Sequence, residues 1–194
     1  MWVTEDLQPL PRNIYGATKV AAEDLCELVH RDHGLPCVIL RTARFFPEPD
    51  DTAAIREGYS TANAQLNELL YRRVDIADVA QAHQRAVERA DSIGFGRFVV
   101  SATTPFARTD VSDLRRDAPS VVRRYFPGFE QAYTDLGWRM FPVIDRVYDS
   151  TRARAALGWE PRHDFASGLE RVAAGLDARS ALAGRIGEKG YHRS

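Results

Sequence analysis

The sequence is poor in cysteine, in long apolar runs and in net charge. Its two cysteines, Cys26 and Cys37, have neither the spacing of a metal site nor the density of a disulfide-stabilised secreted domain. No apolar run approaches the roughly 18 residues of a membrane-spanning helix, and the first residues lack the basic and apolar regions of a secretion signal. These absences predict reduced thiols, a cytoplasmic location and no membrane association.

The near balance of charge also limits the partners that the chain can attract. A formal net charge of −1 provides no overall field for nucleic acid or an anionic membrane. Two arginine pairs, Arg115–Arg116 and Arg123–Arg124, form a local basic cluster that we interpret as the solvated face of a helix. With 44% apolar and 27% charged residues, 194 residues can form one globular domain with a small appended lobe. We therefore expect no nucleic-acid binding.

The candidate chemistry centres on Tyr15 and Lys19, which lie four residues apart at the start of a helical pattern. Residues at this spacing point to one face of a helix. A free tyrosine titrates near pH ~10, and a neighbouring ammonium favours the phenolate and lowers that pKa. The pair can therefore exchange a proton with a hydroxyl or carbonyl group. On spacing alone, however, the more common interpretation is a packed tyrosine beside a solvated lysine.

Hydrophobic periodicity predicts an α/β fold with a parallel sheet. Asn13 is a suitable N-cap and Gly34 a suitable stop for a helix that runs to about residue 33. The continuous apolar run Cys37–Leu40 predicts a buried parallel strand. A further strand is expected at residues 97–101, and we interpret Asp78 as the cap of a helix. The first helix is expected to pack through one stripe, which consists of Ile14, Thr18, Ala21, Leu25, Leu28 and Val29.

The chain divides into three predicted regions. Residues 1–104 carry the predicted strands, and residues 105–178 form a second region, in which residues 105–137 alternate prolines, caps and charged segments that predict two or three short helices. Residues 179–194 are expected to be a flexible tail. A Gly-x-x-Gly-x-x-Gly pattern runs from Gly184 to Gly190, but a nucleotide-binding turn needs a preceding strand and a following helix. We therefore interpret these glycines as unrelated to nucleotide binding.

Other polar clusters do not predict a metal site. Glu48, Asp50 and Asp51 lie along a proline-containing loop with no neighbouring ligand, so we expect them to be solvated. His30 and His33 stand at the end of the first helix, where cations or hydrogen-bond donors suit the negative end of the helix dipole. No bound metal is expected.

Six segments of the chain follow the order of one enzyme family. They are Val3–Asp6, Pro9–Pro11, Tyr15–Lys19 with Glu23, Val38–Arg41, Val74–Val79 and Leu157–Pro161, the last of which reads Leu-Gly-Trp-Glu-Pro. This series resembles the NAD-dependent epimerase/dehydratase family, the extended short-chain dehydrogenases/reductases, over about residues 3–177. The resemblance implies the C-terminal portion of a Rossmann-like parallel sheet with a small α+β substrate lobe. Residues 1–104 would be a remnant of the NAD(P)-binding domain, with a strand at residues 72–78 that leads into a helix, and residues 105–178 would be mostly the substrate-binding lobe.

The resemblance also implies roles for individual residues. The cofactor would be NAD or NADP, and the small-molecule substrate would present a hydroxyl or carbonyl group, as a nucleotide sugar does. Tyr15 would be the acid/base, while Lys19 would lower its pKa and hold the nicotinamide ribose. The cofactor contacts would continue through Ala43, Arg44 and Phe45, with Arg44 in the place of a common asparagine. The implied substrate contacts are Phe46, Asn63, Arg72 and Arg146.

Arg146 and the region before Tyr15 leave alternatives open. Arg146 has the offset of an arginine that contacts the diphosphate in nucleotide-sugar members, and an exposed structural arginine is the other interpretation. Members carry a glycine-rich dinucleotide turn and a catalytic Ser or Thr well before the tyrosine, whereas fourteen residues precede Tyr15. We therefore expect the C-terminal part of such an enzyme, inactive alone, which pairs with a missing N-terminal half or forms a homodimer. The alternatives are a non-catalytic interaction module and a gene-model fragment.

Overall fold

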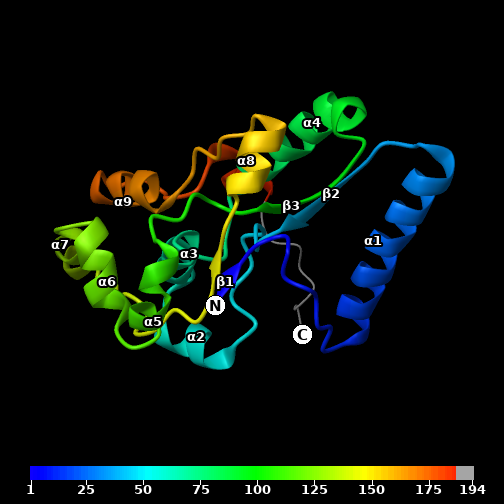
Figure 1. Cartoon of the computed structure of the whole chain (residues 1–194). Coiled ribbons are helices and arrows are strands. Elements are labelled where there is room, and N and C mark those ends of the chain that lie inside the picture. Colours follow the sequence, from blue (N-terminus) through cyan, green and yellow to red (C-terminus); the bar gives the residue numbers. More distant parts are fainter. Residues whose placement is uncertain (187–194) are drawn as a thin grey trace, which may run out of the picture.

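The computed structural model describes residues 1–186 and contains many helices and four short strands (Figure 1). The strands are β1 (Trp2–Val3), β2 (Cys37–Thr42), β3 (Phe95–Val100) and β4 (Val147–Tyr148). The helices are α1 (Ile14–His33), α2 (Ala53–Gly58), α3 (Thr61–Leu69), α4 (Ile76–Ile93), the 3₁₀ turn η1 (Arg108–Asp110), α5 (Val111–Leu114), α6 (Ala118–Tyr125), α7 (Phe129–Asp135), α8 (Thr151–Leu157), α9 (Phe165–Ala173) and α10 (Ala181–Ile186). The predicted α/β class is confirmed.

The strands form two parallel pairs. β2 pairs with β3 over six residues, in a register that places Arg41 opposite Val99, and β1 pairs with β4 near the other end of the chain. The strand expected at residues 72–78 is reduced to a single parallel bridge between Arg44 and Arg73. The reason is local, because α4 begins at Ile76 and a strand cannot continue beyond that residue.

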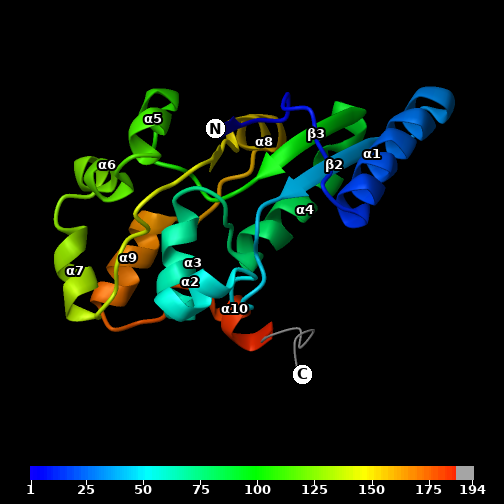
Figure 2. The same cartoon turned by 90° about the horizontal axis from the view of Figure 1, so that it is seen from below.

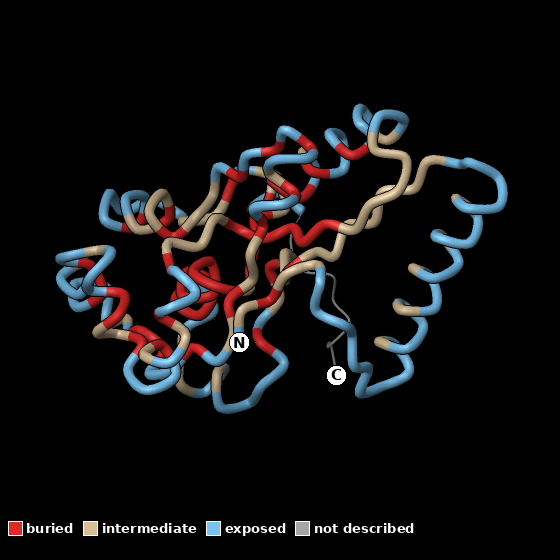
Figure 3. Tube along the Cα trace, viewed as in Figure 1, coloured by how far each residue is buried: buried red, intermediate tan, exposed pale blue. Residues whose placement is uncertain are grey.

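The β2–β3 pair lies between helices on both faces (Figure 1 and Figure 2). α1 lies against one face, and α4 and α8 cover the other. The core under α4 and α8 includes Val79, Phe98 and Trp159. A second core lies in a lobe built from α2, α3, α5, α6, α7 and α9, around Leu66 and Val121. Figure 3 shows that buried residues gather in these regions, whereas α1 is largely exposed. The predicted boundary at residue 104 does not separate the cores, since α3 belongs to the lobe and α8 to the sheet.

α1 has the predicted bounds but not the predicted packing. Asn13 Oδ1 accepts a hydrogen bond from the Gly16 N–H at 2.8 Å, and Gly34 ends the helix in the left-handed conformation with a φ of 67°. No residue of α1 is buried, so the expected packed stripe is wrong, and Leu25 is 60% exposed. The face that carries Glu23 turns towards β2 instead, because that carboxylate pairs with arginines of the sheet.

The aspartate that caps α4 is not the one that was expected. Asp75, not Asp78, is the N-cap, and its side chain accepts from the Ala77 N–H at 2.8 Å. Asp78 is buried and accepts from the backbone N–H groups of Arg162 and His163 at 3.0 and 2.9 Å. Asp78 therefore attaches the segment after α8 to α4, a contact that no local sequence signal marks.

We expect His163 to make the stability of the fold depend on pH. Its Nδ1 lies 3.1 Å from Asp78 Oδ2, and this hydrogen bond raises the pKa of His163 above its ordinary value, against an opposing effect of burial. A raised folded-state pKa stabilises the protein fully below the unfolded value of ~6.5, and this contribution is lost as the pH rises through the folded value. Urea unfolding between pH 5.5 and 9 should show this loss.

The control for this prediction is His163→Gln, which can keep a hydrogen bond but cannot titrate. In this variant the part of the pH dependence that comes from His163 should disappear. Asp75 and Arg171 also act on the His163 charge, from α4 and α9, and both are retained in the variant. An unchanged pH dependence in His163→Gln would contradict the prediction.

The C-terminal segment differs from the flexible tail that was expected. Residues 181–186 form α10, Ala183 is buried, and the Ser180 N–H donates to Asp75 at 2.9 Å. Gly187 and Gly190, the remaining glycines of the repeated pattern, lie outside the described residues. Within residues 1–186, none of the helices combines the length and the apolar character that crossing a bilayer requires. In the same residues, no group of three or more His, Cys, Asp or Glu side chains is placed to hold a metal ion.

Candidate functional site

The first turns of α1 carry Tyr15 and Lys19 on one face. Lys19 Nζ lies 5.1 Å from the centroid of the Tyr15 ring, which is a cation–π contact worth about 0.5–1 kcal/mol at an exposed position. Tyr15 is 70% exposed, so its phenol is open to solvent and to a ligand. The predicted helical pairing of these two side chains is therefore present, with the ammonium over the ring.

An open cleft of about 510 Å³ runs between α1 and the carboxyl end of β2. This volume is in the range of small-molecule sites. The two rings at the end of the strand, Phe45 and Phe46, lie with their centroids 4.1 Å apart. The residues that line the cleft are Tyr15, Lys19, Ala22, Glu23, Cys26, Ile39, Leu40, Arg41, Thr42, Phe45 and Phe46. Four of the predicted site residues, Tyr15, Lys19, Phe45 and Phe46, are thus brought together.

A second cleft of about 300 Å³ adjoins the first. It is lined by the loop before α1, from Val3 to Pro9, and by Gly16. The two clefts share Lys19, Glu23, Arg41 and Thr42. Lys19 therefore lines both clefts and lies where they meet.

Arg44 and Arg72, which were expected to contact the cofactor and the substrate, are joined to two buried carboxylates. Glu68 is 1% exposed and accepts from Arg72 Nη2 and from Arg73 Nε, each at 2.8 Å. Asp50 accepts from Arg44 Nη1 at 2.7 Å and from Arg72 Nη2 at 2.9 Å. The expectation of a solvated Asp50 is wrong, since it is 8% exposed. Arg44 and Arg72 are the partners of the Asp50 carboxylate, and the sequence of the loop does not show that they approach it.

Asp50 stays ionised in this buried network. Burial alone would raise the pKa of Asp50, but the Thr52 N–H at 2.7 Å and the Arg44 charge outweigh that effect and hold the pKa below its ordinary value. Three guanidinium groups face the buried carboxylates of Asp50 and Glu68, and the exposed Asp51 carboxylate lies 4.0 Å from Arg44, so the formal charges balance. Arg44 directly precedes Phe45 in the chain, so this network adjoins the segment that lines the cleft.

The remaining predicted residues do not lie in the cleft. Ala43 is buried in the core under α4 and α8. Asn63 is also buried, and both ends of its amide bond to the backbone of Arg139, at 3.0 and 3.1 Å. Arg146 is exposed and paired with Asp145, whose carboxylate accepts from Arg146 Nη2 at 2.8 Å. Of these three side chains, only that of Arg146 is open to a ligand.

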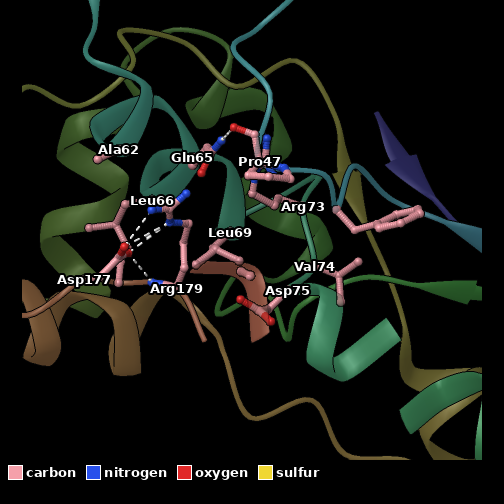
Figure 4. Close-up of a pocket in the computed structure, with 13 residues that line it drawn as sticks. Pro47, Ala62, Gln65, Leu66, Leu69, Arg73, Val74, Asp75, Asp177 and Arg179 are labelled. Carbon is pink, nitrogen blue, oxygen red and sulfur yellow. Dashed lines mark hydrogen bonds and ion pairs between the residues drawn. The ribbon is translucent and has the colours of Figure 1, made fainter. Parts of the chain in front are cut away.

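Phe45 also lines a second, small cavity, together with Pro47, Leu66 and Val74 (Figure 4). The cavity lies between α3, the start of α4 and the C-terminal segment, and its volume is about 30 Å³. Such a space holds one or two water molecules. Its polar neighbours are already engaged, since Gln65 donates to the Pro47 carbonyl at 2.9 Å and Asp75 accepts from Ser180. The cavity is therefore a packing feature, and the candidate site is the cleft at Tyr15.

Three charged residues that order this site are not predicted from the sequence. Arg41 on β2 and Arg97 on β3 both bond the carboxylate of Glu23 on α1. One signal was available, because Glu23 follows Lys19 by four residues and so shares its face of the helix. Arg97 is 74 residues from Glu23, and no local pattern connects the two.

Comparison with known proteins places this site in a family. A model of the NAD dependent epimerase/dehydratase family matches residues 3–101, which are 99 of the 194 residues. The match includes Tyr15, Lys19 and the lining of the cleft. A search among curated proteins finds no match.

Solved structures of similar fold include three longer proteins. UDP-N-acetylglucosamine 4-epimerase from Bacillus cereus has a TM-score of 0.51 at 20% identity, with 88% of this chain and 55% of the enzyme covered. dTDP-glucose 4,6-dehydratase from Bacillus anthracis str. Ames, in complex with NAD, has a TM-score of 0.51 at 15% identity, with 90% and 55% covered. RMD from Pseudomonas aeruginosa, complexed with NADPH, has a TM-score of 0.50 at 19% identity, with 91% and 60% covered.

These likenesses show the fold. They confirm the predicted fold class, a C-terminal portion of a Rossmann-like parallel sheet, and this chain spans 55–60% of the length of the solved structures it resembles. The family follows from the sequence match over residues 3–101 and from the Tyr15–Lys19 pair that lies within it. The chain belongs to the NAD dependent epimerase/dehydratase family.

Proposed function

We propose that this chain carries the acid/base group of an NAD(P)-dependent oxidoreductase, epimerase or dehydratase, and that its substrate is a nucleotide sugar. The observation that carries the proposal is the cleft that Tyr15 and Lys19 share at the carboxyl end of β2. Open α/β sheets bind ligands at that edge. Two of the enzymes with a similar fold are named for UDP- and dTDP-linked sugars, which supports the nucleotide-sugar substrate.

In this proposal Tyr15 exchanges a proton with the substrate. Its Oη gives the proton to, or takes it from, a hydroxyl or carbonyl oxygen within hydrogen-bond distance. The Lys19 ammonium places a positive charge over the Tyr15 ring, 5.1 Å from its centroid. Because Lys19 has a long flexible side chain and lies where the two clefts meet, the same ammonium can also donate to a ribose hydroxyl.

NAD or NADP would supply hydride transfer to and from the substrate carbon. Tyr15, Lys19 and Phe45 are the residues whose side chains would hold its nicotinamide end, and the two adjoining clefts offer space along α1 and β2. Ala43 is buried and Arg44 is engaged with Asp50. Any cofactor contact at these two positions would therefore come from their backbone groups.

The first test is a titration of NADH and of NADPH against the chain, followed by nicotinamide fluorescence, with a thermal melt of the same sample. Saturable binding by a folded chain, weakened at least about 10-fold in Lys19→Met, would support the proposal. Arg85→Met, which removes an equal charge from the exposed side of α4, should leave binding unchanged. A cooperative melt without binding of either cofactor would contradict a cofactor site in the isolated chain.

Arg146 tests the substrate class. Its guanidinium is partly exposed and pairs with Asp145, with a further interaction with Tyr148, so a diphosphate can replace the Asp145 carboxylate. In a preparation that turns over a nucleotide sugar, Arg146→Ala should raise KM about 10- to 100-fold, the usual loss for a charged hydrogen bond. KM for a substrate without a diphosphate should not change. An unchanged KM for the nucleotide sugar would contradict the diphosphate role.

A second candidate function is that of an interaction module. Within residues 1–186 the edge of β2 that faces away from β3 pairs with no strand, and α1 presents Leu25 and Leu28 to solvent. Unpaired strand edges and exposed leucines favour association. We propose either a separate dinucleotide-binding half or a second copy of the chain as the partner. Light scattering after size-exclusion chromatography distinguishes a dimer from a monomer, and a monomer at about 0.1 mM would contradict the homodimer.

A further inference from the structure

The helix that carries Tyr15 and Lys19 is held on the sheet by charge. No residue of α1 is buried, whereas α4 on the opposite face of the sheet buries apolar residues that include Val79, Ala82 and Ala86. Burial of an apolar face usually provides most of the stability of a helix in a protein. Since α1 lacks such a face, its position is set by polar contacts, together with the stacking of His30 on Phe95 at its C-terminal end, with the ring centroids 5.6 Å apart.

These contacts form an arginine–glutamate ladder, which consists of Glu23 and Glu27 on α1, Arg41 on β2 and Arg97 on β3. Arg41 Nε and Nη2 donate to the Glu23 carboxylate at 3.0 and 2.7 Å, and Arg97 Nε donates to the same carboxylate at 3.1 Å. Arg97 Nη2 reaches Glu27 at 2.6 Å. The Glu23 side chain is only 16% exposed, so water and salt screen these pairs less than a surface pair.

Arg41 also fixes the loop that precedes α1. Its Nη1 donates to the Glu5 carbonyl at 3.1 Å, and the Glu5 carboxylate accepts from the Val99 N–H at 2.7 Å. Arg41 and Val99 are partners in the parallel register of β2 and β3. The segment from Glu5 to Glu23 is therefore attached at both ends to one pair of neighbouring strand residues.

The position of Glu23 determines the position of the catalytic face. Glu23 lies four residues after Lys19 and eight after Tyr15, on the same face of the helix. A slip of one residue moves an α-helix by about 1.5 Å and turns it by about 100°. A planar guanidinium donates two hydrogen bonds to a carboxylate only in a narrow range of geometries. A helix held at Glu23 therefore cannot rotate about its axis or slide along it, and this fixes the position of Tyr15, which lies about 12 Å away along the axis.

We propose that Arg41 is a positioning residue, which sets the register of the Tyr15–Lys19 helix against the sheet by holding Glu23 and Glu5 at once. For turnover, the inference rests on the proposed function. For the docking of α1 it does not, because the ladder consists of protein groups and needs no ligand.

Cys26 provides a reporter for the docking of α1. It lies between Glu23 and Glu27 on the helix and lines the same cleft as Arg41. In a Cys37→Ser background, Arg41→Met should speed the reaction of Cys26 with 4,4′-dithiodipyridine about 10- to 100-fold, the factor that a charged hydrogen bond contributes. Arg41→Lys keeps the positive charge but not the planar guanidinium. Its Cys26 should therefore react faster than in the chain that keeps Arg41 and more slowly than in Arg41→Met. Arg85→Met is the matched control and should leave the rate unchanged.

The reciprocal background separates docking from a general loosening of the fold. In a Cys26→Ser chain the remaining thiol, Cys37, reports on the start of β2. Arg41→Met should leave the Cys37 rate unchanged, and an equal acceleration of both thiols would overturn the inference.

Turnover provides an independent readout. In a preparation that converts substrate, Arg41→Met should lower kcat about 10²-fold and change KM little, because a displacement of about 1 Å at the reacting group costs that much. An unchanged kcat would overturn the positioning role. Failure of the unsubstituted chain to bind NADH or NADPH would contradict the proposed function alone, since the thiol rates do not depend on a cofactor.

Discussion

Replacing Tyr15 with phenylalanine should lower turnover by about 10²–10⁴-fold, the range that a positioned acid or base contributes. The variant loses one oxygen from a ring that is 70% exposed and takes no part in either core. Its melting temperature should therefore match that of the unsubstituted chain. Affinity for NADH or NADPH should change little as well, because the Lys19 ammonium and the two clefts remain. The measurement is kcat and KM for a nucleotide sugar, together with the cofactor titration.

Tyr125→Phe is the matched control for this experiment. It removes the same hydroxyl from a partly exposed tyrosine on α6, in the lobe, where the phenol donates to Asp110 at 2.5 Å. This variant should keep its turnover, although it loses a hydrogen bond. Turnover retained in Tyr15→Phe, or an equal loss in both variants, would refute the acid/base role of Tyr15.

Replacing Glu68 with alanine should lower the free energy of unfolding by about 3–5 kcal/mol, the cost of removing one partner from a buried ion pair. Glu68 is 1% exposed and neutralises Arg73, which is buried with it. Burial lowers the pKa of Arg73, and the Glu68 charge opposes that effect only in part. Without Glu68 the buried Arg73 guanidinium loses the carboxylate that neutralises it. For a chain of this size the melting temperature should fall by about 6–20 °C.

Urea unfolding measures this effect, and two further variants interpret it. Glu130→Ala breaks the pair between Glu130 and Arg123, in which both side chains are about half exposed, and it should change stability little. Glu68→Gln keeps the shape and some hydrogen bonds but not the charge. Its loss of unfolding free energy should therefore lie between that of Glu68→Ala and that of Glu130→Ala. Similar losses in Glu68→Ala and Glu130→Ala would contradict the view that burial makes the Glu68 network strong.

The elements that were predicted well are those with local signals. Asn13 and Gly34 mark the ends of α1 because capping involves only the nearest residues. The apolar run at residues 37–40 marks β2 for the same kind of reason. Tyr15 and Lys19 share the cleft with Phe45 and Phe46 as expected, since helical spacing and the end of a parallel strand are both visible in the sequence.

The predictions that were wrong depend on distant partners. Asp50 is buried because Arg44 and Arg72 neutralise it, and loop composition does not show which arginines will approach. Asp78 bonds residues more than 80 positions later, so its sequence looked like that of a cap. The stripe on α1 was assigned to a core by its periodicity alone. The structure shows that Glu23, on the neighbouring face, determines how this helix sits.

The parallel pairing of β1 with β4 has a consequence for how the chain folds. Trp2 Nε1 donates to Asp149, 147 residues later, so this contact closes almost the whole length of the described chain. Contacts of such long sequence separation form late, because the entropy of loop closure has to be overcome first. During synthesis Trp2 is made long before its partner exists. The indole of Trp2 should therefore report the last stage of folding, after the two cores around Trp138 and Trp159 have formed.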